Sequence, residues 1–471
     1  MALKIFNSFS QQKEVFQPLE PGVVKMYVCG PTVYDEPHIG HLRSAYVFET
    51  MRRYLQSSMC GYKVFFVRNV TDVDDKIIEK AHAQGAADLT QAVLEVSKTY
   101  FDLYKRDLRR LGISEPTREP KATEHVGQMT SLIKRLVEKG MAYESEGDVY
   151  YDVRRFEAYG KLSHQNQKAM LENVRVDKNE KKRDPLDFAL WKHAKEGEPS
   201  WPSPWGAGRP GWHIECSAMS MQYLGETFDI HGGGRDLLFP HHENEVAQSE
   251  GATSNPFVRF WVHHGLITVD GQKMSKSMKN FITLDTVLKD DPRYGDEILK
   301  LTFLGTHYSA PLDYSSERSA MDRSVWKRFF EFFQNSRILD KEGHKPSEKK
   351  IPQIYALFRE AMDNDFNTPD VLAVMHKLIS DAYKEKDPVF TVTAASAIRN
   401  FGAEVFGIVF DQDELPGLTK DEIERFIRER ADAKKKKDYK ASDEIRERLL
   451  KEKKVELRDL PDGRTTWRVR L

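Results

Sequence analysis

Two short motifs in this 471-residue chain carry side chains suited to chemistry on a nucleoside triphosphate. In Pro37-His38-Ile39-Gly40-His41, two imidazoles flank a glycine and can donate hydrogen bonds to negative charge that develops on a reacting α-phosphate. In Lys273-Met274-Ser275-Lys276-Ser277, two ammonium groups could hold a leaving pyrophosphate. Either motif alone also fits an ordinary turn or a solvated loop. Together they predict attack on the α-phosphate of ATP, with His38, His41, Lys273 and Lys276 as catalytic residues and Gly40 letting the backbone approach the phosphates.

A second group of residues has the donor atoms of a metal site. Cys29 follows an apolar run, Cys216 lies in Gly211-Trp212-His213-Ile214-Glu215-Cys216, and His241 and Glu245 are four residues apart, so they share a face if they lie on a helix. Two thiolates, one imidazole and one carboxylate suit zinc. The alternative is a pair of buried cysteines acting as small apolar side chains beside a solvated helix face. His242 could also pair with Glu245, at a spacing of three.

The overall composition is that of a globular protein without a membrane anchor. Hydrophobic residues make up 39% of the chain and charged residues 31%, and the net charge is −1, so a polyanionic partner would have to be bound by local basic faces. No apolar run approaches the roughly 18 residues that cross a bilayer, and the N-terminus has no signal-peptide segment. Three cysteines are too few for a disulfide scaffold. We therefore expect a cytoplasmic protein with no membrane contact.

The elements that must position the first motif form a βαβ pattern. Val23–Val28 is β-rich, apolar residues follow at helical spacing (Leu42, Ala45, Phe48, Met51 and Leu55), and Val64–Val67 is a second apolar run. This order predicts a parallel βαβ unit with a ligand site where the first strand ends. The fold class that we expect is α/β: a Rossmann-like parallel-sheet catalytic domain with an insertion, then an α-helical bundle and a small α+β C-terminal domain.

Changes in character along the chain predict six segments. They are a first half of the catalytic domain (1–119), a connective insertion (120–209), a second half of the catalytic domain (210–260), a junction with the lysine motif (261–316), a helical bundle (317–415) and a C-terminal domain (416–471). The insertion is too short to hold an editing domain.

The C-terminal segment combines a helical pair with a small hairpin. The predicted elements are helices at 422–430 and 439–450 and strands at 455–457 and 465–469, joined by the turn Pro461-Asp462-Gly463. From 421 to 471, 17 Lys and Arg against 13 Asp and Glu give +4, with a basic run at Lys434–Lys437. This excess favours contact with phosphates, although a solvated helix face would look similar.

The two motifs in this order, around a predicted α/β sheet, resemble the signatures of class I aminoacyl-tRNA synthetases. Further segments resemble cysteinyl-tRNA synthetases across nearly the whole chain: Cys29 to Asp35, Asn69 to Lys76, Asp187 to Lys192, Gly208 to Cys216 and His231 to Glu245. In that family the residues that match Cys29, Cys216, His241 and Glu245 hold one zinc ion that binds the substrate thiol. It is only the resemblance that prefers His241 over His242.

The resemblance also implies substrates and further site residues. The substrates would be L-cysteine, ATP with Mg²⁺, and tRNA(Cys), which is charged on the 2′-hydroxyl of its terminal ribose through a cysteinyl-adenylate. Thr71, Trp212 and His231 would lie beside the amino acid, and Gly233 and Asp236 under the nucleotide. Trp467 would be an exposed aromatic able to stack an unpaired anticodon base. Cys60 would be structural, and a monomer is expected.

Two departures from the family pattern and two rival functions stand beside this expectation. Met278-Lys279 replaces the usual Leu-Gly pair, and Tyr308 is not followed by the usual arginine. One rival is a cysteine ligase that acts on a small amine, which would lack the anticodon-binding end. The other is a non-catalytic zinc- and RNA-binding paralogue, which would be expected to have lost His38, His41 or Lys276.

Overall fold

The structure is a computed structural model of the chain. It describes residues 2–86, 88–165, 170, 181–274, 278, 280–410, 420–453, 455–459 and 465–469. Lys276 and Lys279 lie outside these residues. The chain divides into two compact units, the first made of 1–286, 303–314 and 360–368, and the second of 287–302, 315–359 and 369–471.

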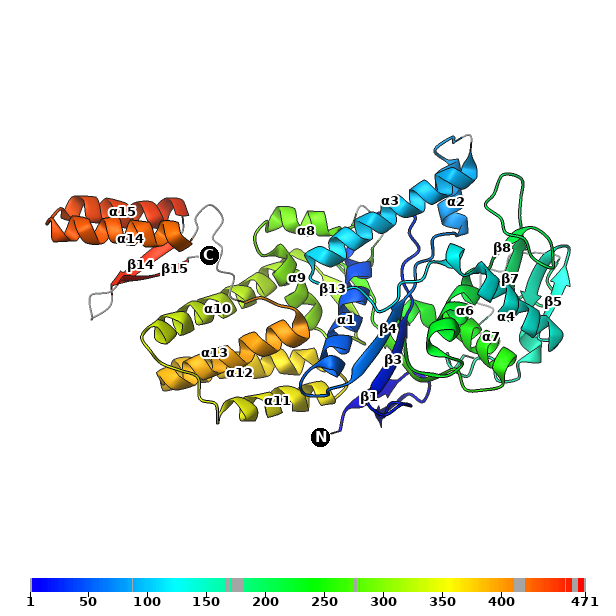
Figure 1. Ribbon diagram of the computed structural model, residues 1–471, viewed down its shortest axis with the longest axis horizontal. Coiled ribbons are helices and arrows are strands. Elements are labelled where there is room, and N and C mark those ends of the chain that lie inside the picture. Colours follow the sequence, from blue (N-terminus) through cyan, green and yellow to red (C-terminus); the bar gives the residue numbers. More distant parts are fainter. Residues whose placement is uncertain are drawn as a thin grey trace. The chain divides into compact units, whose positions relative to one another are not determined.

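A four-stranded parallel sheet lies at the centre of the first unit (Figure 1). Its strands, in spatial order, are β10 (Val258–His264), β9 (Phe228–Gly234), β3 (Val23–Val28) and β4 (Lys63–Arg68). β3 continues through α1 (Ile39–Gln56) to β4 on one side, whereas β9 continues through α7 (Glu243–Thr253) to β10 on the other. The carboxyl ends of β3 and β9 therefore form a topological switch point, where open α/β sheets bind ligands.

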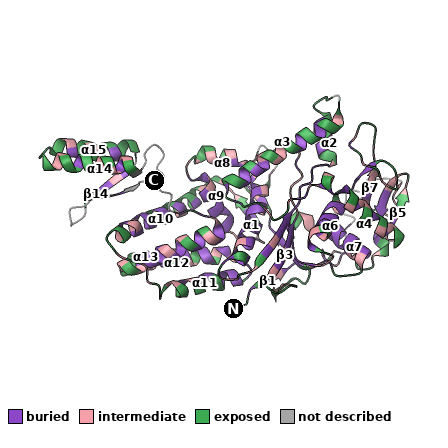
Figure 2. Cartoon of the chain, viewed as in Figure 1, coloured by how far each residue is buried: buried purple, intermediate pink, exposed green. Residues whose placement is uncertain are grey.

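Burial follows the amphipathic pattern of these elements. The residues that predicted the first helix, Leu42, Ala45, Phe48, Met51 and Leu55, are all buried on α1. β9 is buried along its whole length, as expected for a strand covered on both faces (Figure 2). Gly232 allows α1 to pack closely on this strand, because a Cβ there would lie 2.3 Å from the Phe48 ring.

The segment between β4 and β9 adds helices and a second, antiparallel sheet. This sheet has the order β5-β6-β7-β8. The elements are α2 (Asp75–His82), α3 (Leu89–Arg110), η1 (Ala122–Glu124), α4 (Val126–Glu138), β5 (Ala142–Ser145), β6 (Asp148–Tyr151), η2 (Val153–Arg155), β7 (Phe188–His193), β8 (Gly208–Pro210) and α6 (Trp212–Leu224).

Smaller elements complete the first unit. They are the hairpin β1 (Lys4–Asn7) and β2 (Gln12–Val15), the turns η3 (Arg235–Leu237) and η4 (Leu238–His242) before α7, and the strands β11 (Ile267–Val269), β12 (Gln272–Lys273) and β13 (Leu312–Tyr314). β11 lies between β12 and β13, so Lys273 stands at the end of a short edge strand.

The second unit is mainly helical. Its elements are α9 (Gly295–Leu304), α10 (Ser316–Lys341), α11 (Ile351–Asp363), α12 (Thr368–Glu385), α13 (Pro388–Phe401), η5 (Gly402–Phe406), α14 (Lys420–Lys435), α15 (Tyr439–Lys453), β14 (Val455–Asp459) and β15 (Thr465–Val469). The division between the units falls within α8 (Leu284–Asp290) and near the ends of α9, α11 and α12. Aromatic pairs join the bundle helices, such as Phe358 of α11 and Phe401 of α13 with ring centroids 4.6 Å apart. The fold class expected from the sequence is confirmed, including the antiparallel hairpin of β14 and β15.

The prediction of an exposed Trp467 is wrong. Trp467 pairs with Leu457 across the hairpin, and Val455 lies on the same face two residues away. These three side chains are 7%, 3% and 0% exposed, so this face of the hairpin is buried and the indole is not free to stack a base.

No helix in the part of the chain that the structure describes has the length and apolar character needed to cross a membrane.

Candidate active site and metal centre

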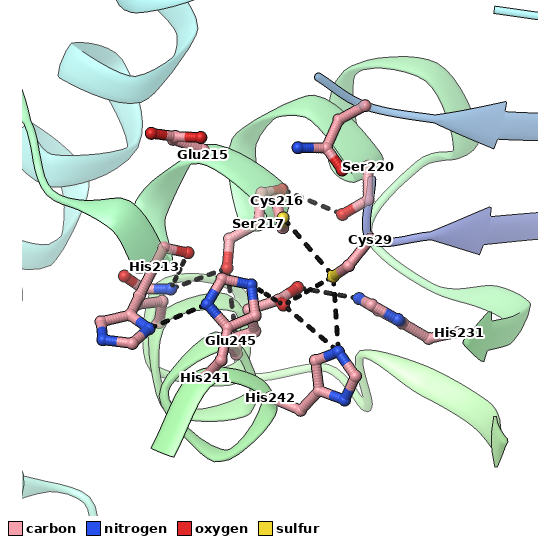
Figure 3. Close-up of polar contacts among 12 residues, drawn as sticks. Cys29, His213, Glu215, Cys216, Ser217, Ser220, His231, His241, His242 and Glu245 are labelled. Atoms are coloured by element: carbon pink, nitrogen blue, oxygen red, sulfur yellow. Dashed lines mark hydrogen bonds and ion pairs between the residues drawn. The ribbon is translucent and has the colours of Figure 1, made fainter. Parts of the chain in front are cut away.

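The four predicted metal ligands meet at the switch point of the central sheet. Cys29 directly follows β3, Cys216 lies on α6, His241 in η4 and Glu245 on α7 (Figure 3). Their donor atoms all lie within 4.8 Å of one another. The two sulfurs are 3.6 Å apart, and the His241 Nε2 lies 3.0 Å from Glu245 Oε1.

These distances and donors fit a zinc ion. With Zn–S bonds of about 2.3 Å, the edge between two sulfurs of a tetrahedron is about 3.8 Å, close to the observed separation. All four groups are buried. A buried carboxylate and two thiols without a cation would be an unfavourable arrangement, which the ion would relieve.

The charges of the cluster also suit a cation. Burial opposes ionisation of the Cys216 thiol, but a hydrogen bond from Cys29 and the positive charge of His241 bring its pKa down to about 6. The pKa of Cys29 is raised by burial and by its contact with Cys216. Against the effect of burial, His231 and His241 hold the pKa of Glu245 at about 2. A thiolate and a carboxylate are therefore present at neutral pH. Against the effect of burial, Cys216 and Glu245 raise the pKa of His241 to about 10, so they stabilise a proton on its ring. A bound dication would replace that proton.

A second set of donors overlaps the first. Cys29, His231, His242 and Glu245 also lie within 4.8 Å of one another. His242 Nε2 is 3.4 Å from Cys29 Sγ, and His231 Nε2 is 2.8 Å from Glu245 Oε2. The geometry alone thus leaves His241 and His242 as competing ligands, as the sequence did.

Further histidines surround both sets. His213 Nδ1 lies 3.0 Å from His241 Nδ1, His242 Nδ1 lies 2.8 Å from His263 Nε2, and His263 Nδ1 lies 2.8 Å from the hydroxyl of Ser8. Neither His213 nor His263 was predicted from the sequence to lie at the site, and the contact between His242 and Cys29 was not predicted either. His213 could have been found, because it stands three residues before Cys216 at helical spacing.

Of the three residues predicted to lie beside the amino acid, Trp212 and His231 contact the cluster, and Thr71 contacts the residue next to Cys216. The Trp212 ring lies 4.2 Å from the His241 ring and is 39% exposed. His231 is fully buried, stacked on Trp261 with centroids 4.5 Å apart. The Thr71 hydroxyl donates to Glu215, a buried carboxylate next to Cys216 that the sequence analysis did not single out. A cavity of about 780 Å³ is lined by Trp212 and Glu215, which neighbour the cluster, and by none of the four ligands themselves.

His38 and His41 form a reciprocal cap at the start of α1. His38 Nδ1 accepts from the Gly40 N–H at 3.0 Å, and His41 Nδ1 accepts from the His38 N–H at 3.2 Å. Because Nδ1 is the acceptor in both rings, each neutral imidazole carries its proton on Nε2. The rings are stacked, with centroids 3.8 Å apart. Burial lowers the pKa of His38 to about 4 and that of His41 to about 3, so both are neutral donors at physiological pH.

The remaining predicted residues lie at the same edge of the sheet or in the lysine loop. Gly233 is the penultimate residue of β9, and the exposed Asp236 follows in η3. Lys273 is exposed, and its carbonyl accepts from the Asn280 amide at 3.2 Å. Beyond the loop, the Phe281 ring meets the His38 ring edge to face at 5.2 Å.

Comparison with known proteins gives a consistent result. The family described as "tRNA synthetases class I (C) catalytic domain" matches residues 15–324, and a DALR domain matches 357–411. The chain is 46% identical to a protein named Cysteine--tRNA ligase from Syntrophotalea carbinolica and 44% identical to one from Geobacter metallireducens, over 100% of both chains in each case. A Caldicellulosiruptor saccharolyticus protein of the same name is 41% identical over 99% of this chain and 100% of its own.

Solved structures share the fold at low sequence identity. Mycobacterium tuberculosis methionyl-tRNA synthetase superposes with a TM-score of 0.62 at 14% identity, covering 82% of this chain and 92% of that one. A leucyl-tRNA synthetase from Agrobacterium radiobacter gives 0.59 at 12% identity, covering 83% and 85%.

Proposed function

The chain belongs to the cysteine–tRNA ligase family of class I aminoacyl-tRNA synthetases, and from this premise we propose that it activates cysteine with ATP, passes it to tRNA(Cys) through a cysteinyl-adenylate, and selects the substrate by its thiol with zinc. The observation that carries the proposal is the buried cluster of Cys29, Cys216, His241 and Glu245 at the end of the strand that leads into the His38 motif.

Activation requires donors aimed at charge that develops on the α-phosphate. The cysteine carboxylate attacks that phosphate and pyrophosphate leaves. The Nε2–H groups of His38 and His41 hydrogen-bond the growing negative charge, with no proton transfer, because both rings remain neutral. Gly40 and the start of α1 would lie close to the phosphates, where the helix dipole favours negative charge.

The zinc ion would be held by Cys29, Cys216, His241 and Glu245. When bound, it would supply a Lewis acid that binds a thiolate strongly and lowers the pKa of the substrate thiol from its free value of about 8.5. Serine has only a hydroxyl to offer, and valine has no ligand. A pocket that relied on size would separate such near-isosteres by only about 10–200-fold, the range in which synthetases need editing.

Other residues would position the substrates. Thr71, Trp212 and His231 would lie beside the cysteine; Gly233 and Asp236 would lie under the nucleotide of Mg-ATP. Lys273 and Lys276 would hold the leaving pyrophosphate.

The second unit would supply the surface for tRNA. We propose that residues 416–471 contact the anticodon end, mainly through basic groups such as those at Lys434–Lys437, since Trp467 is buried. A monomer in the cytoplasm completes the proposal.

One assay series tests this function. ATP–pyrophosphate exchange is measured with cysteine, serine and valine, and transfer is then measured to tRNA(Cys) and to a small amine. The proposal expects exchange with cysteine alone and transfer to tRNA. Exchange without tRNA charging would favour the small-amine ligase, and no exchange at all would favour a non-catalytic paralogue.

The choice between His241 and His242 can be tested by a matched pair of variants. We expect His241→Ala to lose bound zinc, with an affinity at least about 10–100-fold lower, because even an outer partner contributes that much. His242→Ala should keep about one zinc per chain. Metal analysis after dialysis checks both, and the reverse pattern would make Cys29, His231, His242 and Glu245 the ligands.

A further inference from the structure

A buried arginine ties the helix that carries the two catalytic histidines to the base of the lysine loop. Arg43, on α1, is 0% exposed. Its Nη1 donates to the carbonyls of Gly265 at 2.6 Å and Leu266 at 3.0 Å, and its Nη2 donates to the carbonyl of Ala310 at 2.7 Å. A longer contact of 3.4 Å reaches the Tyr308 carbonyl. One guanidinium therefore holds two separate segments of backbone.

The electrostatics of this contact are unusual for a buried cation. Burial lowers the pKa of Arg43 to about 10, so it is still charged at neutral pH. Its partners here are carbonyl dipoles rather than a carboxylate. The planar fork of Arg43 places a separate nitrogen on each of the two segments, whereas the three N–H donors of a lysine would all have to diverge from one nitrogen.

The first segment that Arg43 holds leads directly into the lysine motif. Gly265 and Leu266 join β10 to β11, and β12 ends at Lys273. A Cβ on Gly265 would lie 2.1 Å from the Ala310 oxygen, so the two held segments touch only because residue 265 is glycine. The Gly265 N–H also donates to the Tyr308 carbonyl at 2.9 Å.

The returning end of the loop is fixed to the same helix. The Ile39 N–H donates to the Ile282 carbonyl at 3.0 Å, next to the contact between Phe281 and His38. The first turns of α1 therefore anchor both ends of the segment that carries Lys273.

We propose that Arg43 is a positioning residue for the activation step, which sets the base of the Lys273 loop relative to His38 and His41. The proposal rests on the function proposed above, in which His38 and His41 act on the α-phosphate of ATP and the lysine loop holds the pyrophosphate that leaves it. A misplacement of about 1 Å between such groups can lower the rate about 10²-fold.

The test compares Arg43→Lys with Arg52→Lys in the full-length enzyme. Arg52 is a matched control because it is a buried arginine on the same helix, but it binds Glu49 and the Glu115 carbonyl instead of the loop. The assay is cysteine-dependent ATP–pyrophosphate exchange, with the rate divided by the concentration of active sites found by titration. In this assay Arg43→Lys should lower kcat about 10²-fold and raise KM for ATP. KM for cysteine and zinc content should not change. Arg52→Lys should keep the parent kcat.

Hydrogen exchange provides a measurement that does not depend on catalysis. Arg43→Lys should speed amide exchange across 265–273, and Arg52→Lys should not. The proposal would be overturned if Arg43→Lys kept both the kcat and the hydrogen-exchange rates of the parent enzyme. It would also be overturned if Arg43→Lys and Arg52→Lys lost kcat and hydrogen-exchange protection equally. If the parent enzyme itself failed to activate cysteine, the proposed function would fall, and the hydrogen-exchange comparison would still decide whether Arg43 holds the loop base.

Discussion

His38→Asn is expected to fold like the parent enzyme and to activate cysteine with a kcat about 10²–10³-fold lower. That loss is typical when one preorganised donor to a developing oxyanion is removed. Asparagine is among the best N-cap residues, so its side chain can still accept the Gly40 N–H that His38 Nδ1 now accepts. The Nε2–H donor is lost. Pyrophosphate exchange at saturating cysteine and ATP measures the effect, with KM for cysteine expected to stay close to the parent value.

His38→Ala separates the two roles of this residue. Alanine removes both the cap and the donor, so it should lose the same activity and, in addition, about 1 kcal/mol of unfolding free energy. Denaturant unfolding of both variants shows whether this difference exists. If His38→Asn kept full activity, His38 would be a helix cap and nothing more.

Cys216→Ser is expected to lose zinc and, with it, the discrimination between cysteine and serine. A hydroxyl is a poorer zinc ligand than a thiolate. Loss of a residue that only hydrogen-bonds a metal ligand typically lowers metal affinity roughly 10–100-fold, so loss of a ligand should lower the affinity for zinc by at least that much. Any remaining activation should then separate cysteine from serine or valine by no more than the approximately 10–200-fold that size allows. Metal analysis and exchange with the three amino acids check this.

Cys60→Ser is the control for the same chemical change. Cys60 lies outside the metal cluster, after the end of α1, and is partly exposed. This variant should keep about one zinc per chain and the parent specificity. A metal-free Cys216→Ser enzyme with parent specificity would contradict the role of zinc.

Much of the fold could be predicted because its signals are local. β3 begins and ends at the predicted residues, and the five residues of the predicted apolar stripe are all buried on α1. The hairpin of β14 and β15 was also readable, from two short runs around a Pro-Asp-Gly turn. Such periodicities depend only on the element itself.

Side-chain environments were harder to predict because they depend on packing between distant elements. Trp467 and its cross-strand partner Leu457 are both buried, and hairpin strands alone do not say which face is covered. Arg43 sits among polar and apolar neighbours on α1 like any helical arginine. Its partners are more than 220 residues away in sequence, so nothing local marks it.

The metal cluster shows both limits together. Its donor types were readable in the sequence, but its ligands come from three separate parts of the chain, and only the fold brings them within 4.8 Å. His242 and His263 join the cluster for the same reason, since β10 runs beside β9. The choice of His241 rested on family resemblance and still requires the variant pair.

Direct binding of the substrate thiol to the metal is the central claim, and cobalt substitution tests it most directly. Cobalt(II) replaces zinc in thiolate sites and gives sulfur-to-metal charge-transfer absorption that grows with each added thiolate. We expect this absorption to rise on titration with cysteine, to saturate at one equivalent per chain, and not to change with serine. A cobalt enzyme that binds and activates cysteine with no change in the band would contradict the claim.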